Sequence, residues 1–466
     1  MAHSVKEYEV IARKQDQMDK EVQEWRLDPR SALYDHVVIH ARLARLQKLS
    51  STNDIGPLMF FLRAGMIRNL AGINNKRLYR RAHWGTKCLI EGYVEETIRQ
   101  LEHVAHSKAV PKVQLREFFL DLKKSYGTTA LVLHGGTSFG LCHLGVIKAL
   151  LEIDSLPQVV CGSFIGSVIA AIVCTKSEAE LRSELCGNGG SLVDIGAFTV
   201  KGGSLIASAI RKLVRFLKSG KLLDVMVIER CIQDNIGNMT FREAYQKSGR
   251  ALNIVIRDKD TLVLLNHMNA PDVVIWSAAC ASCAIPGVYE EVKIMVKDSR
   301  GLAPWTPSSG FKLASATIEK GDLRGQLGEL YGVNSMIVSH VPSFCSFRPS
   351  LASDEGYRGM SKRVYKWIIS EVCHRYHQFK YFGLVPGFVE KWERFVVRPQ
   401  VGDVNIIPHL YYWEVLMLMR NPDAQFIEYC IQKGERFAWK RAREVQMRCM
   451  IEFAIDNNVQ RLGKRK

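Results

Sequence analysis

The 466-residue sequence lacks an apolar run long enough to cross a bilayer. The longest such run, Val159–Cys174, is shorter than the ~20 residues that a membrane-spanning helix needs. It contains two glycines, so we interpret it as a buried strand followed by a helix. Met1–Arg30 is charged and has no apolar core, which predicts no secretory signal peptide. Any attachment to a membrane is therefore expected to be peripheral.

The cysteines also lack a dense, regular spacing. The 12 cysteines are scattered, which excludes a disulfide-stapled secreted scaffold and predicts reduced thiols. Cys280 and Cys283 form a Cys-x-x-Cys motif, but no second pair or histidine ligand lies near it in the sequence, so a zinc or redox site is not expected. We expect no metal ion and no cofactor.

Acidic residues are too few to balance the basic ones. Lysine and arginine number 64 against 47 aspartates and glutamates, a formal charge of +17, which predicts attraction to polyanions. No basic segment belongs to a helix-turn-helix, zinc-finger or RNA-recognition pattern, so we expect anionic lipid surfaces rather than nucleic acid. The basic segments are Arg63 with Arg68, Lys76–Arg81, Arg211–Lys218, Arg436–Arg448 and Arg461–Lys466.

One basic segment is also amphipathic. Ser204–Lys218 places apolar residues on one helical face and four cationic residues elsewhere. Such a helix can lie on a membrane surface, but an ordinary surface helix packed on a core is the more common explanation of such a pattern.

The chain divides into three parts. Residues 1–107 have helical periodicity, including Leu33–Leu49 and Gly85–Leu101, and residues 350–466 are again helix-rich and basic. Residues 128–342 alternate strands and helices, which predicts an α/β layered fold with a largely parallel sheet, flanked by helical regions. The expected strands are Ala130–Leu133, Gln158–Cys161, Ala251–Ile256 and Met336–Val341, with Gly402–Pro408 as a further strand or loop, and the expected helices of this part are Phe139–Ile153 and Gly166–Cys174.

The segment Gln158–Ser167 has the layout of a nucleophile elbow, in which a strand turns sharply into a helix. Gly162, Ser163 and Gly166 match the residues around the turn, but Phe164 occupies its centre. A phenyl ring has neither a lone pair nor an acidic proton, so Phe164 cannot attack an ester.

A glycine-rich turn follows the preceding strand, in Leu131–Gly140. Glycines let the backbone approach a ligand, and N–H groups at a helix N-terminus stabilise developing negative charge. The turn is therefore a candidate oxyanion loop, although a purely structural turn would use the same glycines. Its candidate residues are Gly135, Gly136, Thr137, Ser138 and Gly140.

These motifs, in this order, resemble the patatin-like phospholipases, and the flanking segments resemble the triacylglycerol-lipase branch of fungi and plants, including its N-terminal helical region. The resemblance covers nearly the whole chain. Besides the loop and the elbow, it rests on Trp25–Asp35, Arg68–Ile73, Thr240–Tyr245, Ser277–Gly287, Gly402–Ile406 and Asn421–Pro422.

The resemblance implies serine acyl-ester hydrolysis by a serine–aspartate dyad, with the aspartate in an Asp-Gly motif. Carried over by position, the serine falls on Phe164 and the aspartate on Ser315, which Ala316 follows. The chain contains no Asp-Gly dipeptide, and Asp298 or Asp322 would have to supply another carboxylate. The resemblance therefore implies a family member impaired in hydrolysis.

The resemblance also implies partners and a location. We expect the chain to bind acylglycerols or phospholipids at the surface of a lipid droplet or on the cytoplasmic side of the endoplasmic reticulum membrane. Pairing with an active paralogue would give such a protein a regulatory role.

Two alternatives retain activity. Ser163, Ser167 or Cys161 could serve as a non-standard nucleophile of an acyl hydrolase. His267 and Asp272 have the H-x-x-x-x-D spacing of some glycerolipid acyltransferases, in which a histidine activates an acceptor hydroxyl, although two residue types at one spacing often coincide by accident.

Overall fold

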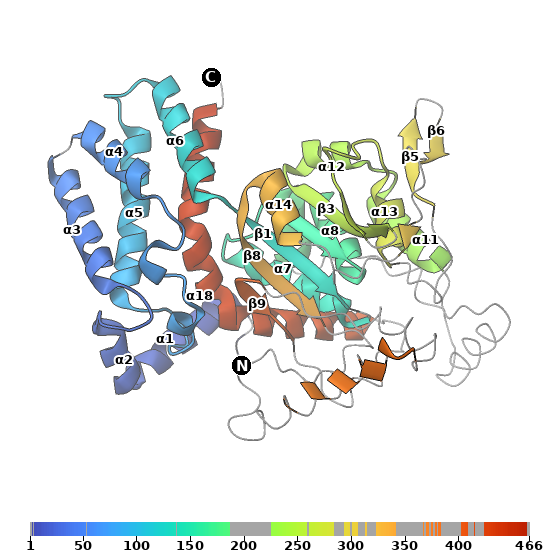
Figure 1. Ribbon diagram of the computed structural model, residues 1–466, viewed down its shortest axis with the longest axis horizontal. Helices are drawn as coiled ribbons and strands as arrows, with labels where there is room; N and C mark the ends of the chain where they lie inside the picture. Colours follow the sequence, from blue (N-terminus) through green and yellow to red (C-terminus); the bar gives the residue numbers. More distant parts are fainter. Residues whose placement is uncertain are drawn as a thin grey trace.

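Figure 1 shows the computed structural model of the protein. It describes residues 2, 4–52, 54–136, 138–186, 225–258, 261–283, 293–298, 301–305, 313–314, 323–341, 402–408, 414 and 424–463, with isolated residues between 367 and 383. Thr137, Ser315, Asp322 and the amphipathic segment Ser204–Lys218 therefore lie outside the described residues.

The centre of the fold is a seven-stranded sheet in the order β4-β3-β2-β1-β8-β9, with β7 paired to β3. The neighbouring strands β3, β2, β1, β8 and β9 are parallel to one another, whereas β4 and β7 run antiparallel to β3. This confirms the predicted α/β class with a largely parallel sheet. The strands are β1 (Thr128–Gly135), β2 (Val159–Ser163), β3 (Ala251–Asp258), β4 (Thr261–Leu265), β7 (Leu313–Ala314), β8 (Val333–Val341) and β9 (Val404–Ile406).

Each predicted strand overlaps an observed one. The strands β1, β3 and β8 extend beyond their predicted ends, β2 lies one to two residues further along the chain, and β9 is shorter than Gly402–Pro408. Strands that are buried on both faces consist of continuous apolar residues, which is why the sequence predicts them. A separate hairpin of β5 (Met295–Asp298) and β6 (Gly301–Pro304) was not expected, because it is short and largely exposed.

Alternate residues of the strands enter two different cores. Leu131 and Leu133 of β1 pack with α7, α8, α13 and α18, whereas Ala130 and Val132 pack on the opposite face with α14. The helices around the sheet are α7 (Cys142–Glu152), α8 (Ile165–Cys174), α9 (Glu178–Cys186), α11 (Val225–Ile236), α12 (Phe241–Ser248), α13 (Ile275–Cys283) and α14 (Leu323–Tyr331).

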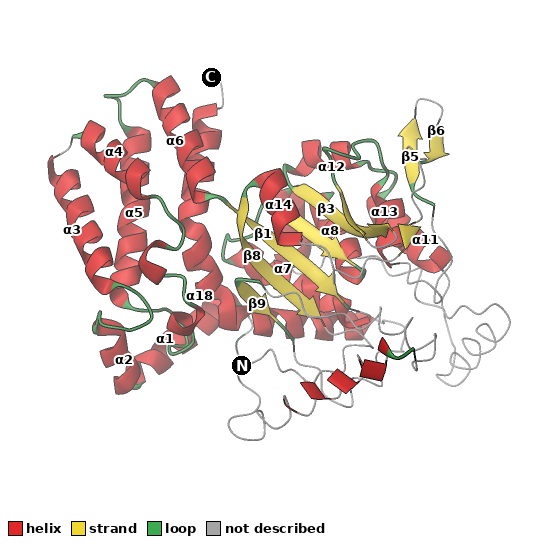
Figure 2. Cartoon of the chain, in the orientation of Figure 1, coloured by secondary structure: helices red, strands yellow, loops and turns green. Residues whose placement is uncertain are grey.

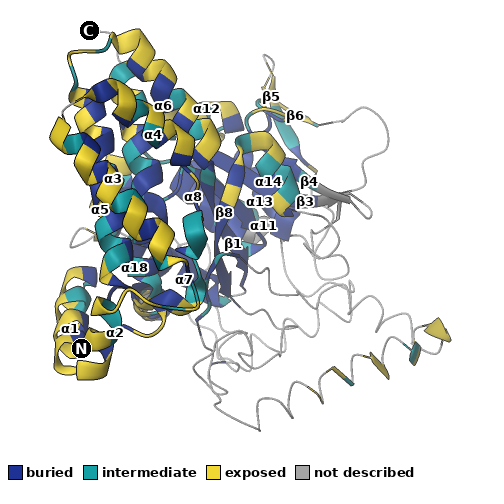
Figure 3. Cartoon of the chain, turned by 60° about the vertical axis from the view of Figure 1, so that its left-hand side comes forward, coloured by how far each residue is buried: buried dark blue, intermediate teal, exposed yellow. Residues whose placement is uncertain are grey.

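The N-terminal helices stand beside the sheet and form a third core (Figure 1). Exposed residues lie on their outer faces, whereas the strands of the sheet are buried (Figure 3). The helices are α1 (Val5–Met18), α2 (Lys20–Leu27), α3 (His36–Thr52), α4 (Ile55–Gly65), α5 (Cys88–His106) and α6 (Lys112–Tyr126), with short 3-10 helices η1 (Leu70–Gly72) and η2 (Lys76–Tyr79). No helix in the described part of the chain is long and apolar enough to cross a bilayer.

The helix α18 (Ala424–Gly463) joins these two parts (Figure 2). Its first half packs on α7, and its second half contributes Met447, Ile451 and Ile455 to the core of the N-terminal helices. The contact with α7 is so close that a Cβ atom on Gly434 would lie 2.0 Å from the carbonyl oxygen of Cys142. The two ends of the chain therefore share one packed structure.

A buried ion pair lies where these parts meet. The guanidinium of Arg68 is 2.7 Å from a carboxylate oxygen of Glu452 in α18, and both side chains are less than a tenth exposed. Arg68 also donates to Thr129 Oγ1 at 2.6 Å and to the carbonyl oxygen of Gly127 at 2.9 Å. Glu452 accepts a hydrogen bond from the backbone N–H of Thr129 at 2.8 Å. One ion pair thus ties the N-terminal helices, the start of β1 and α18 together.

We expect the substitution Arg68→Ala to lower the free energy of unfolding by about 3–5 kcal/mol, because it leaves the Glu452 carboxylate buried without its cation. The matched control is Arg63→Ala, since Arg63 pairs with Asp121 at 3.1 Å but both side chains are about half exposed. That substitution should cost at most about 1 kcal/mol. Urea unfolding of the two variants measures the difference, and equal losses would contradict the assigned role of the ion pair.

Candidate active site at the carboxyl end of the sheet

Phe164 forms the apex of a tight turn between β2 and α8. Its backbone has φ 55° and ψ −133°, a conformation that residues other than glycine adopt only under strain. The glycines on either side make the turn possible. A Cβ atom on Gly162 would lie 2.5 Å from Ser167 Cα, and one on Gly166 would lie 2.2 Å from the carbonyl oxygen of Leu133. This sharp strand-to-helix turn is the geometry of a nucleophile elbow, with a phenylalanine at the nucleophile position.

Serine hydroxyls hold the strained turn in place. The backbone N–H of Phe164 donates to Ser282 Oγ at 3.2 Å, and Ser282 in turn donates to the carbonyl oxygen of Val255 at 2.7 Å. The carbonyl oxygen of Phe164 accepts from the N–H and the hydroxyl of Ser167, at 2.9 and 2.6 Å. The sequence pattern did not assign Ser282 a role. Its position within the segment Ser277–Gly287, which carries part of the family resemblance, is the one sequence feature that could have indicated this role.

The glycine-rich turn lies directly against the elbow. Gly135 and Gly136 have positive φ angles of 82° and 90°, and a Cβ atom on Gly140 would lie 2.5 Å from Ile165 Cγ2 at the start of α8. The backbone N–H of Gly136 donates to the carbonyl oxygen of Val341 at 3.0 Å. That amide therefore holds the turn onto β8. Ser138 begins the 3-10 helix η3 (Ser138–Leu141).

Three buried histidines surround this end of the sheet. His134 is the penultimate residue of β1, and its Nδ1 atom lies 2.6 Å from Ser163 Oγ on the neighbouring strand. Its ring stacks on His340 of β8 at 5.2 Å and meets the Phe164 ring edge-on at 6.3 Å. On the α7 face of the sheet, His143 Nδ1 lies 2.8 Å from Ser339 Oγ.

Burial keeps these imidazoles neutral. It lowers the pKa of His143 to about 3 and that of His340 to about 4. The pKa of His134 is held well below its usual range by burial and, in addition, by the neighbouring His340 and His143. One ring nitrogen of each has no hydrogen-bond partner among the described residues. Sequence reasoning missed this cluster, although a histidine at the end of an apolar strand is an unusual residue in that place.

Ser163 and Cys161 lie in β2 and are fully buried. Burial raises the pKa of the Cys161 thiol to about 12, so this thiol stays protonated. Cys161 packs in the core on the α14 side of the sheet, and the alternation of the strand places Ser163 on the same side. The elbow thus brings together Phe164, Gly162, Ser163 and Gly166 with the turn at Gly135.

The other candidate residues lie elsewhere. Asp298 is exposed in the β5–β6 hairpin, which projects from the body of the protein (Figure 1). The ring of His267 stacks on Tyr245 at 4.0 Å, whereas Asp272 pairs with Arg242 at 3.3 Å. His267 and Asp272 form no hydrogen bond with each other within the described ranges, so the structure does not support the acyltransferase interpretation.

The Cys-x-x-Cys motif lies inside α13. Cys280 and Cys283 are both buried free cysteines. Across the residues that the structure describes, no group of histidine, cysteine and acidic side chains converges in a way that could hold a metal ion.

The buried histidines predict a pH-dependent stability. Because their folded pKa values lie below the unfolded value of about 6.5, the unfolded state binds more protons as the pH falls. The contribution of the neutral histidines to the free energy of unfolding is fully present above about pH 6.5. It is lost progressively as the pH falls toward their pKa values in the folded protein. Urea unfolding measures the free energy of unfolding between about pH 7 and about pH 5. This free energy should fall less with decreasing pH for the double variant His143→Gln with His340→Gln than for the wild type. His40→Gln, at an exposed site on α3, should leave the slope unchanged, and a wild-type slope in the double variant would contradict this assignment.

Comparison with known proteins identifies two regions. Residues 131–303 match the patatin-like phospholipase family, and residues 1–124 match a domain of unknown function, DUF3336. The crystal structure of the type III effector protein ExoU is similar with a TM-score of 0.30 and 15% identity, over 68% of this chain and 53% of that chain. A structural similarity this low adds nothing to the description of the site.

Curated relatives match along nearly the entire chain. Triacylglycerol lipase 5 of Saccharomyces cerevisiae is 29% identical over 94% of this chain and 61% of its own length. Triacylglycerol lipase 4 of the same yeast is 29% identical, also over 94% of this chain, and 50% of its own length is covered. The chain thus spans about half to three fifths of these two relatives. Triacylglycerol lipase ptl3 of Schizosaccharomyces pombe is 29% identical over 95% of this chain and 92% of its own length. The chain therefore contains a patatin-like phospholipase domain, residues 131–303, preceded by a DUF3336 region.

Proposed function

We propose that this protein binds acylglycerols or phospholipids at a lipid surface and is impaired in ester hydrolysis. The observation that carries the proposal is Phe164 at the apex of an otherwise complete nucleophile elbow. The relatives named above are triacylglycerol lipases, which makes an acylglycerol or phospholipid the expected ligand class. Peripheral attachment to a lipid droplet or to the endoplasmic reticulum membrane, and regulation of an active paralogue, are parts of the same proposal.

The surroundings of Phe164 support impaired hydrolysis. Its side chain is only 7% exposed and lies against His134, so an apolar ring fills the place of a nucleophilic hydroxyl. The N–H groups of Phe164 and Gly136 already donate to protein oxygens, and neither is directed to a ligand. The family resemblance places the aspartate of the dyad at Ser315. A serine has no carboxylate that could act as the base.

One contact favours a second candidate function. Ser163 Oγ and His134 Nδ1 are 2.6 Å apart, which is the relation of a serine nucleophile to its general base. In this alternative the protein is an acyl hydrolase that uses Ser163. Both residues are fully buried, however, and Ser163 points toward the α14 side of the sheet rather than into the turn, so impaired hydrolysis is the better supported function.

We expect the purified protein to hydrolyse triacylglycerol and phospholipid no faster than a heat-inactivated sample, and a fluorophosphonate probe to leave it unlabelled. The physical reason is that no activated nucleophile stands at the elbow. Ser163→Ala separates the two candidates. Turnover or labelling in the wild type that disappears in this variant would overturn the proposal and establish Ser163 as the nucleophile.

Reversal of both substitutions should restore activity. We expect Phe164→Ser with Ser315→Asp and Ala316→Gly to show detectable hydrolysis of a short-chain ester, because these changes return a nucleophile and a base to an elbow whose backbone geometry is intact. Phe164→Ser alone and Ser315→Asp alone serve as controls and should stay nearly inactive, because nucleophile and base act together. A folded triple variant that neither turns over the ester nor reacts with the probe would show that the site has diverged further.

A further inference from the structure

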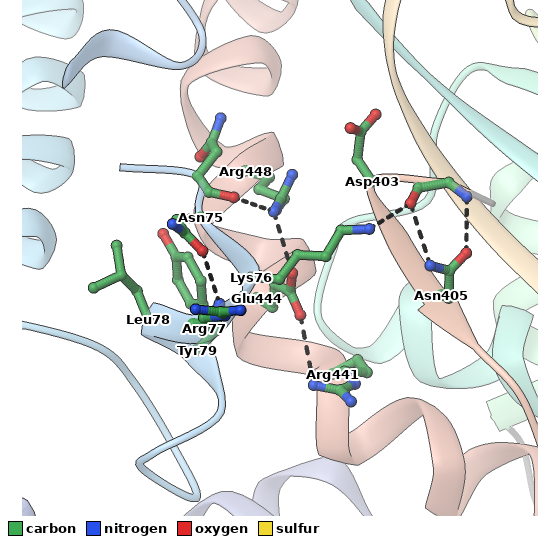
Figure 4. A network of polar contacts seen from close by, with 12 residues as sticks. Asn75, Lys76, Arg77, Leu78, Tyr79, Asp403, Asn405, Arg441, Glu444 and Arg448 are labelled. Atoms are coloured by element: carbon green, nitrogen blue, oxygen red, sulfur yellow. Dashed lines mark hydrogen bonds and ion pairs between the residues drawn. The ribbon is translucent and has the colours of Figure 1, made fainter. Parts of the chain in front are cut away.

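Two basic segments that are far apart in the sequence meet in the structure. Lys76–Arg81 contains η2, and Arg436–Arg448 lies in α18, which passes beside it. Figure 4 shows Arg441 and Arg448 approaching Glu444 from different directions, whereas the Lys76 side chain passes beside Glu444 and extends to the loop before β9. We refer to Lys76, Arg80, Arg441 and Arg448 as the basic junction.

The junction is built on buried groups. Arg448 and Glu444 are each 5% exposed, and Arg448 Nη2 lies 3.2 Å from Glu444 Oε1. The same guanidinium donates to the carbonyl oxygen of Asn74, just before η2. Arg441 Nη1 approaches the other oxygen of Glu444 at 3.8 Å. Glu444 is thus the anion at the centre of the junction, and two arginines already share it.

Lys76 has no comparable partner. Its ammonium group donates to the carbonyl oxygen of Gly402 at 2.7 Å, across to the loop before β9 (Figure 4). No carboxylate oxygen lies within 4.0 Å of its nitrogen among the residues for which the structure gives positions. The nearby Asp403 is paired with Arg324 at 3.0 Å and accepts from the N–H of Met336 at 2.9 Å. Two of the three N–H donors of Lys76 can therefore still bind an acceptor.

The electrostatic balance of the junction is positive. The charges of four cations act on the Glu444 carboxylate, because Arg80 and Lys76 contribute in addition to the two arginines of α18 that contact it. Burial lowers the pKa of Lys76, and the charges of Arg448 and Arg80 act in the same direction, whereas those of Asp403 and Glu444 partly oppose the shift. A half-buried excess of positive charge is costly unless an anion compensates it.

We propose that the basic junction binds a phosphate group. A phosphate carries up to two negative charges and several acceptor oxygens, which suit both a lysine ammonium and the forked donors of arginine. A single carboxylate would neutralise less of the excess. The phosphate could belong to an anionic phospholipid headgroup or be free in solution. This proposal is independent of whether the elbow hydrolyses esters.

The test measures the affinity of the full chain for inorganic phosphate by calorimetry, at an ionic strength held constant with chloride. We expect saturable binding, and we expect Lys76→Gln to weaken it roughly tenfold or more, since charge-assisted hydrogen bonds contribute about a factor of ten or more each. Glutamine retains a donor for the Gly402 carbonyl, so the fold should persist. Arg80→Gln with Arg441→Gln is the second variant, in case Lys76→Gln unfolds.

The matched control changes two exposed lysines elsewhere. Lys108→Gln with Lys112→Gln removes the same charge as the double junction variant from the tip between α5 and α6. The control should bind phosphate like the wild type. Equal weakening in control and junction variants would show a general charge effect and would overturn the proposal.

Vesicles distinguish the two sources of phosphate. In a flotation experiment, phosphatidylcholine vesicles with and without phosphatidic acid are compared. Dependence on phosphatidic acid that the junction variants lose supports a lipid headgroup. Loss of binding to inorganic phosphate alone supports a free phosphate. If the junction variants bind inorganic phosphate and the vesicles as well as the control does, the phosphate site does not exist.

Discussion

The arrangement of this protein depends on the buried pair of Arg68 and Glu452. Arg68 comes from the segment between α4 and η1, and Glu452 comes from the last helix of the chain. Both bind Thr129 at the start of β1, so the pair fixes where the sheet begins relative to the helices. A buried charge without its partner is costly, which is why this contact constrains three separate parts of the fold at once.

The elbow shows that a local backbone geometry can exist without the chemistry that it usually supports. Gly162 and Gly166 permit the close approach of strand and helix, and the hydroxyls of Ser167 and Ser282 fix the turn. None of these contacts involves the side chain of Phe164. The strained φ of 55° therefore follows from the residues around the apex, and it is compatible with an apolar side chain there.

Several segments that carried the family resemblance lie at junctions of the structure. Arg68 begins one of them and supplies the central ion pair. Thr240 and Glu243 form a capping box at the start of α12, and Asn405 in β9 binds the backbone of Gly402 beside Lys76. These residues thus make an ion pair, a helix cap and a loop contact that position neighbouring elements.

The sequence alone determined the fold class, the positions of the central strands and the place of Phe164, because buried parallel strands are continuous apolar runs and the elbow is a local pattern. Periodicity also located α3 and α5. Only the tertiary structure placed His134, His340 and Ser163 together and joined Lys76–Arg81 to α18. These groupings depend on the strand order and on the path of the last helix. Both are set by packing between residues that are far apart in the sequence, and a local sequence pattern does not predict such contacts.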